Sequence, residues 1–304
     1  GVGRKVDLTV NTASKNTKYN LGVVEPYIFN KKMNLLYGLS FTDQNFGSSR
    51  SYNLQTLNTN TGISYDLLDD LSHTFAVEYN LKDYKVTDSS SVAESISKQS
   101  GSNADILLNN KFVYNQLNSF IRPTKGDFFS FTNIFSPITN SDNGYIKNTI
   151  THRKYYSFKT NVFSIQTRLG SIASLQNDEI LTDDKFSLGG RWLRGFDSFG
   201  AGPRNSRTSY IGGNNLIVSK LDLQRPIFQN SDNPVDLNLF FDAGTVFDNK
   251  TEPDDSKESI RSSYGVGIKF YSPIGPVGFS WAFPITKESY DIERMFLFSI
   301  GNLN

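Results

Sequence analysis

Hydrophobic and polar residues alternate along most of this chain of 304 residues. Phe75, Val77 and Tyr79 occupy every second position, with Glu78 and Asn80 on the opposite parity. The same period of two recurs in three further stretches, at 33–42, 262–270 and 277–283. Because successive side chains of a β-strand point to opposite faces, the pattern predicts strands with one apolar and one polar face.

Fourteen such runs can be counted along the chain. They begin near Val6, Tyr19, Met33, Tyr52, His73, Ala104, Asp127, Tyr145, Thr160, Asn215, Val235, Ser262, Pro276 and Met295. Each run has about nine to thirteen residues, the length of a tilted strand that crosses a membrane. Strands of soluble sandwiches usually have about five or six. An even number of long strands predicts an antiparallel barrel with both ends on one side.

The connections between these runs also follow a pattern. The longest connections, 84–103, 174–213, 249–259 and 286–293, all fall on one side of the expected barrel. Long external loops that alternate with shorter turns are typical of outer-membrane barrels. The serine-rich stretch Tyr84–Asn103 is predicted to be a mobile loop. We therefore expect residues 1–304 to form a single all-β domain, a transmembrane antiparallel β-barrel.

The alternative is a soluble sandwich or propeller with an apolar core. Strand length argues against it, as do the charged residues within the strands, which suit a wet lumen. The sequence has no internal repeat of propeller period. The barrel predicts that Phe75, Tyr79, Tyr264, Phe270, Phe279, Trp281 and Phe283 face lipid. It predicts that Glu78, Lys82, Asp242 and Lys269 face inward.

Composition narrows the functional classes. The chain has 31 basic and 30 acidic residues, a net charge of +1, so a nucleic-acid partner is not indicated. It has no cysteine and only two histidines, His73 and His152, which argues against a metal site. Glu179, Asp183 and Asp184 could hold calcium, but a solvated loop is the favoured interpretation. No arrangement of residues suggests catalysis or a cofactor, so we expect a protein that is not an enzyme.

The most informative segment is Lys185–Arg204, KFSLGGRWLRGFDSFGAGPR, within the longest connection. A long loop rich in aromatic residues and glycine should fold back on the protein, and the barrel lumen is the obvious place. Arg194 would then need an acidic partner, because an unpaired charge in a confined space is costly. Strand phase offers Asp222, Asp236 and Asp242. The sequence leaves open whether Arg194 contacts only water.

Leu193, Arg194, Gly195 and Phe196 resemble the VRGF-type motif of the BamA-type assembly family, which includes TamA and the two-partner secretion transporters. Three further stretches match in the right order, 240–246, 271–284 and 296–301. The last resembles the closing strand of the family, with Phe296, Phe298, Ile300 and Gly301. The match covers residues 186–304; the first half of the chain matches mainly by strand pattern.

The resemblance implies that the LRGF motif lies in the lumen, with Arg194 bridging to Asp242 and Asp222. Gly195 would let the backbone turn, and Phe196 would pack against the wall. Barrels of this family have sixteen strands, so we expect the first hairpin and the preceding POTRA repeats to be absent. The first and last strands should then have free edges. The family usually ends in an aromatic residue, whereas this chain ends in Leu303 and Asn304.

The resemblance also implies a function: insertion of unfolded β-barrel clients into the outer membrane of a Gram-negative bacterium through the junction of the first and last strands. Implied partners are unfolded outer-membrane protein clients, accessory assembly lipoproteins and outer-membrane lipid. A translocation pore of the two-partner secretion or TamA type is the main alternative. A passive porin-like channel is a further one, against which the aromatic loop and the LRGF motif argue.

Overall fold

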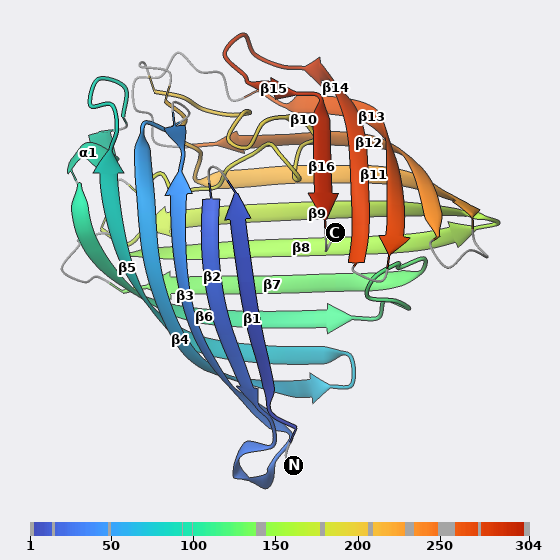
Figure 1. The fold of residues 1–304 in the computed structure, drawn as a ribbon, viewed down its shortest axis with the longest axis horizontal. Helices are drawn as coiled ribbons and strands as arrows, with labels where there is room; N and C mark the ends of the chain where they lie inside the picture. The colour runs from blue at the N-terminus through green and yellow to red at the C-terminus, as the bar shows by residue number, and fades with distance from the viewer. Residues whose placement is uncertain are drawn as a thin grey trace.

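The computed structural model describes residues 3–13, 16–47, 50–92, 94–98, 100–137, 144–176, 180–205, 209–228, 234–248, 259–272 and 275–300. Fourteen strands form one antiparallel sheet in which chain neighbours pair (Figure 1). They are β1 (Lys5–Ala13), β2 (Asn16–Glu25), β3 (Met33–Asn45), β4 (Tyr52–Leu68), β5 (Leu71–Val86), β6 (Gly101–Asn115), β7 (Gly126–Ser136), β8 (Tyr145–Phe158), β9 (Asn161–Ser174), β11 (Asn215–Phe228), β12 (Val235–Phe247), β13 (Arg261–Ser272), β14 (Gly275–Thr286) and β16 (Phe296–Ile300). Each corresponds to one predicted run, so the all-β prediction is confirmed.

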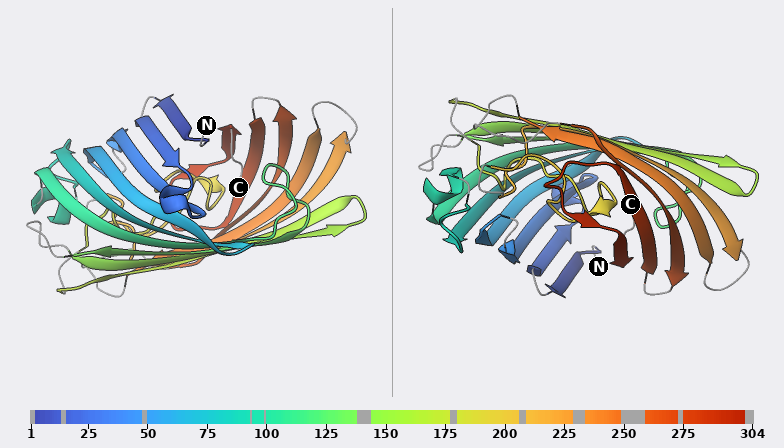
Figure 2. Two further views of the ribbon diagram at one scale, coloured as in Figure 1. Left: turned by 90° about the horizontal axis from the view of Figure 1, so that it is seen from below. Right: turned by 90° about the horizontal axis from the view of Figure 1, so that it is seen from above.

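The sheet curls into a barrel, which brings β1 and β16 to the same side of the molecule (Figure 2). Among the described residues, β1 pairs only with β2 and β16 only with β14. The predicted free edges on the first and last strands are therefore present. Every side chain of β1 from Lys5 to Thr12 is exposed, on both faces of the strand.

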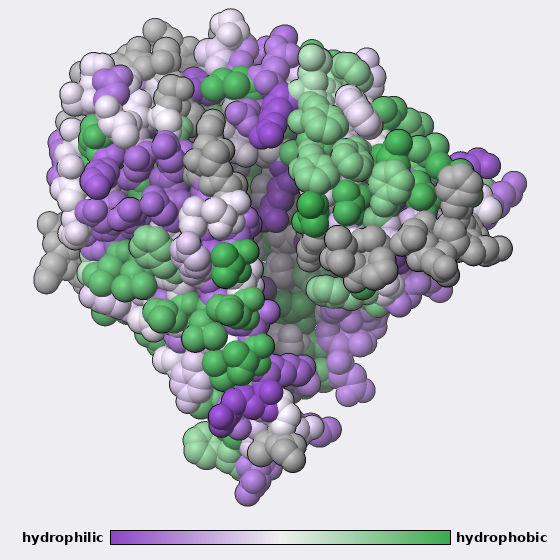
Figure 3. All heavy atoms as spheres, in the orientation of Figure 1, coloured by the Kyte–Doolittle hydropathy of each residue, from purple (hydrophilic) through white to green (hydrophobic). Residues whose placement is uncertain are grey.

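Side chains divide as the period of two predicts. Five of the seven aromatic residues expected to face lipid are exposed: Tyr79, Tyr264, Phe270, Trp281 and Phe283. Phe75 and Phe279 are half-buried on the same outer face. The outer face of β13, β14 and β16 forms a continuous hydrophobic surface (Figure 3). On the inner face, Lys82 and Asp242 are buried.

The inner face of the barrel is lined by polar side chains. Glu78 accepts hydrogen bonds from the side-chain amides of Asn109, at 3.1 Å, and Asn58, at 3.4 Å. Lys269 lines a cavity inside the barrel. A face with this many polar groups fits a lumen and not a dry apolar core.

Two short helical segments interrupt the strands in the described part of the chain, a 3-10 turn at Ile28–Asn30 and α1 at Glu94–Lys98. None of the described helices is long and apolar enough to span a membrane. The helix α1 corrects the prediction for Tyr84–Asn103. Val92 and Ile96 are buried against Tyr52 and Tyr84, so this segment is packed onto the barrel. The serine-rich composition hid these two anchoring residues.

The connection between β9 and β11, residues 175–214, is called here the lumen loop. Its described residues lie inside the curled sheet (Figure 2). It contains the short strand β10 (Gly195–Phe196), which pairs with β15 (Glu293–Arg294). The largest buried apolar cluster consists of loop residues packed on the inner wall: Ile180, Phe186, Leu188, Leu193, Phe196 and Ala201 on Leu107, Tyr145, Ile172, Leu216, Val218 and Val246. The hydrophobic core of the molecule is therefore the contact between this loop and the barrel.

Candidate functional site

Arg194 lies inside the barrel and contacts two carboxylates of the wall. Its Nε donates to Oδ2 of Asp242 at 2.7 Å, and its backbone N–H donates to the same oxygen at 3.1 Å. Its Nη1 and Nη2 donate to the two oxygens of Asp222 at 2.9 and 3.1 Å. Asp222 is on β11 and Asp242 on β12, and the two strands are neighbours. The structure thus brings Arg194 together with two of the three acids that strand phase had suggested.

This ion-pair network is shielded from solvent. Arg194 is 6% exposed and Asp242 has no exposed surface. The guanidinium carbon also lies 3.6 Å from the ring centroid of Phe240, a cation–π contact. Burial alone would lower the pKa of Arg194, but the charges of Asp222 and Asp242 outweigh it and raise that pKa above its ordinary value. The alternative in which Arg194 contacts only water is therefore wrong.

The other three motif residues hold the backbone in place. Leu193 and Phe196 are buried in the apolar cluster. Gly195 has a φ of +95°, a conformation that L side chains rarely adopt. A Cβ there would lie 3.2 Å from the Cβ of Ser263, whose hydroxyl donates to the carbonyl of Arg194. The motif therefore needs glycine for its turn and for its close approach to β13.

A second anchor lies upstream in the lumen loop. The Lys82 ammonium on β5 pairs with Asp183 at 3.1 Å and with Asp184 at 3.0 Å, and also with Asp105 of β6 at 3.0 Å. The hydroxyl of Tyr84 donates to Asp183 at 2.7 Å. The solvated-loop interpretation of Asp183 and Asp184 is therefore wrong, because both are bound to the wall.

The Lys82 ammonium is the cation that faces the Asp183 and Asp184 carboxyl groups at this anchor. Burial would raise the pKa of the Asp183 carboxyl, but Lys82 and the Tyr84 hydroxyl hold it below its ordinary value. Burial raises the pKa of Asp184 above its ordinary value. The ammonium occupies the space between these oxygens, and the third acid considered for calcium, Glu179, lies outside the described residues.

Packing adds a third contact between loop and wall. The ring of Phe186 fills the space that a side chain at Gly170 of β9 would need: a Cβ there would lie 2.5 Å from two ring carbons. The Lys147 ammonium lies 4.7 Å from the centroid of the same ring. Gly170 therefore acts as a seat for Phe186.

Two cationic contacts escaped sequence reasoning. The Arg50 guanidinium, just before β4, lies over Phe46 at 4.9 Å and over Phe199 of the lumen loop at 4.0 Å. Arg122, between β6 and β7, reaches across to Asp236 of β12, with Nε to Oδ2 at 3.0 Å. That hydrogen bond raises the pKa of Arg122. Asp236, offered as a partner for Arg194, is thus held by a different arginine. Nothing in the sequence around either arginine marks its partner.

The closing strand behaves as its alternation predicts. Phe296, Phe298 and Ile300 are exposed on the outer face, and the rings of Phe296 and Phe298 lie 6.3 and 5.2 Å from that of Phe279 on β14. Gly301, the remaining residue predicted for this strand, lies outside the described residues.

Comparisons with known proteins identify the family of this chain. A model of the Omp85 superfamily domain matches residues 1–303. The outer membrane protein assembly factor BamA of Neorickettsia risticii is 25% identical over 285 residues, 90% of this chain and 37% of that protein. The chain thus spans little more than a third of that relative.

Solved structures share the fold. The crystal structure of BamA from Haemophilus ducreyi lacking POTRA domains 1-3 gives a TM-score of 0.85 at 23% identity, covering 98% of this chain and 64% of that one. CdiB from Escherichia coli gives 0.64 at 14% identity, covering 93% of this chain and 52% of that one. Because the superfamily model matches nearly the entire sequence, this chain belongs to the Omp85 superfamily.

Proposed function

We propose that this chain is the barrel of an outer-membrane protein assembly factor, which folds and inserts β-barrel clients without covalent chemistry. The relative from Neorickettsia risticii is named for outer-membrane protein assembly, and this chain shares its family. These relatives and the apolar outer surface place the chain in the outer membrane of a Gram-negative bacterium.

The observation that carries the proposal is the unpaired edge of the last strand. Among the described residues, β16 pairs only with β14, from Val277↔Ile300 to Trp281↔Phe296. The other edge of β16, called here the seam, has no partner among the described residues, so its backbone N–H and C=O groups can pair with a new strand. In this mechanism a client strand adds to the seam by β-augmentation.

The lumen loop supports the same mechanism. Its Arg194 network fastens it to β11 and β12, which β13 and β14 separate from β16. This part of the wall then keeps its shape while strands are exchanged at the edge. The partners of this activity are unfolded outer-membrane protein clients and surrounding outer-membrane lipid, with accessory assembly lipoproteins attached to the complete protein.

A dedicated translocation pore is the second candidate. CdiB has a similar fold, so the fold of the barrel alone does not distinguish between the functions of its members. Transport of one partner through the lumen would require the lumen loop to leave it. The three buried anchors at Arg194, Lys82 and Phe186 argue for a loop that stays. They argue equally against a passive porin-like channel.

The experiment is a reconstitution. The full-length protein that contains this chain is placed in lipid vesicles, and the folding of an unfolded outer-membrane client is followed by its resistance to protease. We expect faster folding than in protein-free vesicles. In a version of that protein with no other cysteine, Ser299→Cys on β16 can report on the seam by disulfide formation with a Cys in the joining strand of the client. An unchanged folding rate would contradict the assembly function. Passage of the client into the vesicle interior would favour translocation instead.

A further inference from the structure

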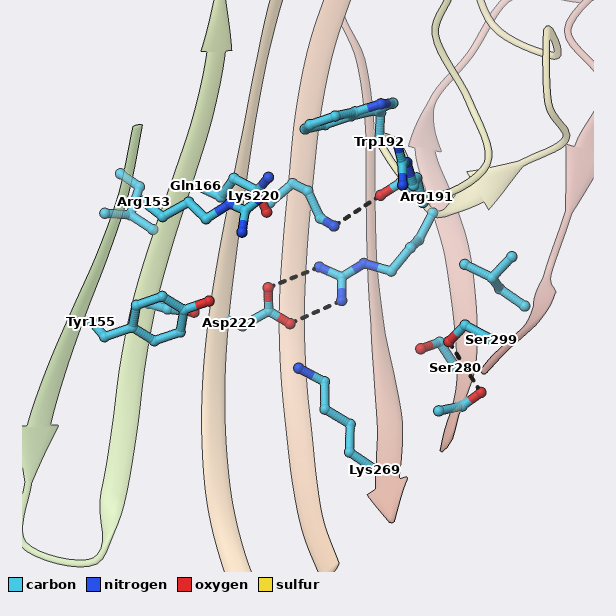
Figure 4. Close-up of a pocket in the computed structure, with 15 residues that line it drawn as sticks. Arg153, Tyr155, Gln166, Arg191, Trp192, Lys220, Asp222, Lys269, Ser280 and Ser299 are labelled. Atoms are coloured by element: carbon cyan, nitrogen blue, oxygen red, sulfur yellow. Dashed lines mark hydrogen bonds and ion pairs between the residues drawn. The ribbon is translucent and has the colours of Figure 1, made fainter. Parts of the chain in front are cut away.

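A cavity in the lumen lies between the LRGF motif and the inner wall. It is lined by residues of β8, β9, β11, β13, β14 and β16 and by Arg191 and Trp192 of the lumen loop (Figure 4). The cavity thus extends along the inner wall to the last strand of the sheet. Among the described residues, the interactions that hold the lumen loop leave several charged side chains of the cavity without an oppositely charged partner.

The cavity has an excess of positive charge. Arg194 shares its charge with Asp222 and Asp242, a group with one net negative charge. Four more cations line the cavity, Arg153, Arg191, Lys220 and Lys269. Within the described part of the chain, none of these four has a carboxylate oxygen within the 4.0 Å of a salt bridge. Three formal positive charges therefore remain unbalanced.

The contacts of these cations show that they are held but not neutralised. Lys220 donates to the backbone carbonyl of Arg191 at 2.8 Å. Arg153 lies over the ring of Phe128 at 5.0 Å, and its Nε is buried with no hydrogen-bond partner among the described residues. Confined cations without counter-charges are costly, so the cavity favours an anionic group.

The position of the cavity indicates where that group comes from. Leu297 and Ser299, the half-buried inner residues of β16, form one side of the cavity. A strand that pairs with the free edge of β16 directs every second side chain into the lumen beside these two residues. An acidic side chain there would point toward Lys269 and Lys220, whereas a phosphate of the bilayer would have to leave the membrane surface.

We propose that this cavity binds the carboxylate side chains of a client strand as it pairs with β16. The inference rests on the proposed assembly function and adds a charge preference to it. The cations select clients with Asp or Glu at lumen-facing positions near the joining edge. They also neutralise those carboxylates while the new barrel is incomplete.

The test uses three synthetic peptides of alternating strand sequence that carry Glu, Gln or Lys at the lumen-facing positions. Binding to the full-length protein in lipid nanodiscs is measured by fluorescence anisotropy. We expect the Glu peptide to bind about ten-fold more tightly than the Gln peptide, because hydrogen bonds to charged groups are stronger than neutral ones. The Lys peptide should bind most weakly. High salt should reduce the difference between the three.

Variants locate the effect. Lys220→Gln with Lys269→Gln should remove most of the preference for Glu, whereas Lys154→Gln, on β8 but paired with Asp127 outside the cavity, should keep it. The order of the three peptides on the unaltered protein needs no variant, so a folding defect cannot hide the answer. Equal binding of Glu and Gln peptides would overturn this inference and leave the assembly function standing. Failure of all three to bind would contradict edge pairing itself, and this inference with it.

Discussion

Arg194 and Asp242 form an ion pair that is shielded from water, so solvent cannot stabilise either charge. Asp242 is completely buried and accepts from the Nε of Arg194 at 2.7 Å. Arg194 also chelates Asp222, so one guanidinium holds two neighbouring strands to the lumen loop. A lysine could not reproduce this planar, forked arrangement.

Arg194→Ala should release the lumen loop without unfolding the barrel. The substitution leaves the buried carboxylate of Asp242 without its cationic partner. This costs about 3–5 kcal/mol where water is excluded and less in a wet lumen. We expect faster protease cleavage within the loop and slower client insertion, with the strand content unchanged by circular dichroism. The Arg194→Lys protein should have rates of loop cleavage and client insertion between those of the unaltered protein and the Arg194→Ala protein.

Arg4→Ala is the matched control. Arg4 is paired with Glu25, but its side chain is 64% exposed, so its loss should change little. Equal loop cleavage in the Arg194→Ala and Arg4→Ala proteins would show that the network does not hold the loop.

The sequence was informative about residues where strand period applies. Asp222 and Asp242 could be assigned to the inner face because they sit in alternating runs. The partners of Arg50, Arg122 and Asp183 could not be predicted, because at least one residue of each pair lies in a loop. Loops have no period, and contacts between distant segments leave no local pattern.

At the scale of elements, the alternation identified all fourteen long strands because each has a lipid face and a lumen face. It missed β10 and β15, which have two residues each and are defined by pairing between two connections. It also missed α1, whose five residues are too few for a helical period. The placement of the lumen loop was expected from its aromatic content, but its anchors at Lys82 and Gly170 were not.

The contact between Phe186 and Gly170 can be tested by exchanging volume. Gly170→Val should displace the Phe186 ring, since a Cβ alone would meet that ring at 2.5 Å. We expect a lower thermal midpoint and a loop that protease cleaves more readily. Phe186→Ala combined with Gly170→Val should restore part of the loss, because the new methyl groups enter the space left by the ring.

Gly22→Val provides the comparison. A Cβ at Gly22 of β2 meets only the Cβ of Asp7, at 3.9 Å, so this substitution should leave loop cleavage unchanged. Additive losses in the Phe186→Ala, Gly170→Val protein would mean that the two residues do not share one space.

At the scale of the whole molecule, the exposed apolar residues make sense only if lipid covers them. Leu239 of β12 is 57% exposed, between neighbours that are themselves apolar and exposed on β11 and β13. Leu239→Arg should destabilise the barrel in lipid by up to about 2–4 kcal/mol, the cost of a basic residue at mid-depth of the bilayer. Unfolding by denaturant in vesicles measures the change.

Phe120→Arg is the corresponding control in a connection. Phe120 lies between β6 and β7 and is 78% exposed, so arginine there should be tolerated. If Leu239→Arg were tolerated equally well, the outer face of β12 would not be in contact with lipid.

The uneven reach of the lumen loop has a mechanical consequence. Its described hydrogen bonds and ion pairs reach β5, β8, β11, β12 and β13, yet none reaches β1 or β2. The loop therefore braces the wall at these strands and gives no such support to β1 and β2. Amide hydrogen exchange should therefore be fastest in β1 and β2 and slowest in β11 and β12. Uniform protection around the circumference would contradict this gradient. A barrel built in this way deforms mainly in the few strands that the loop does not support. A force applied to the edge by an incoming strand would then move those strands and leave the rest of the wall in place.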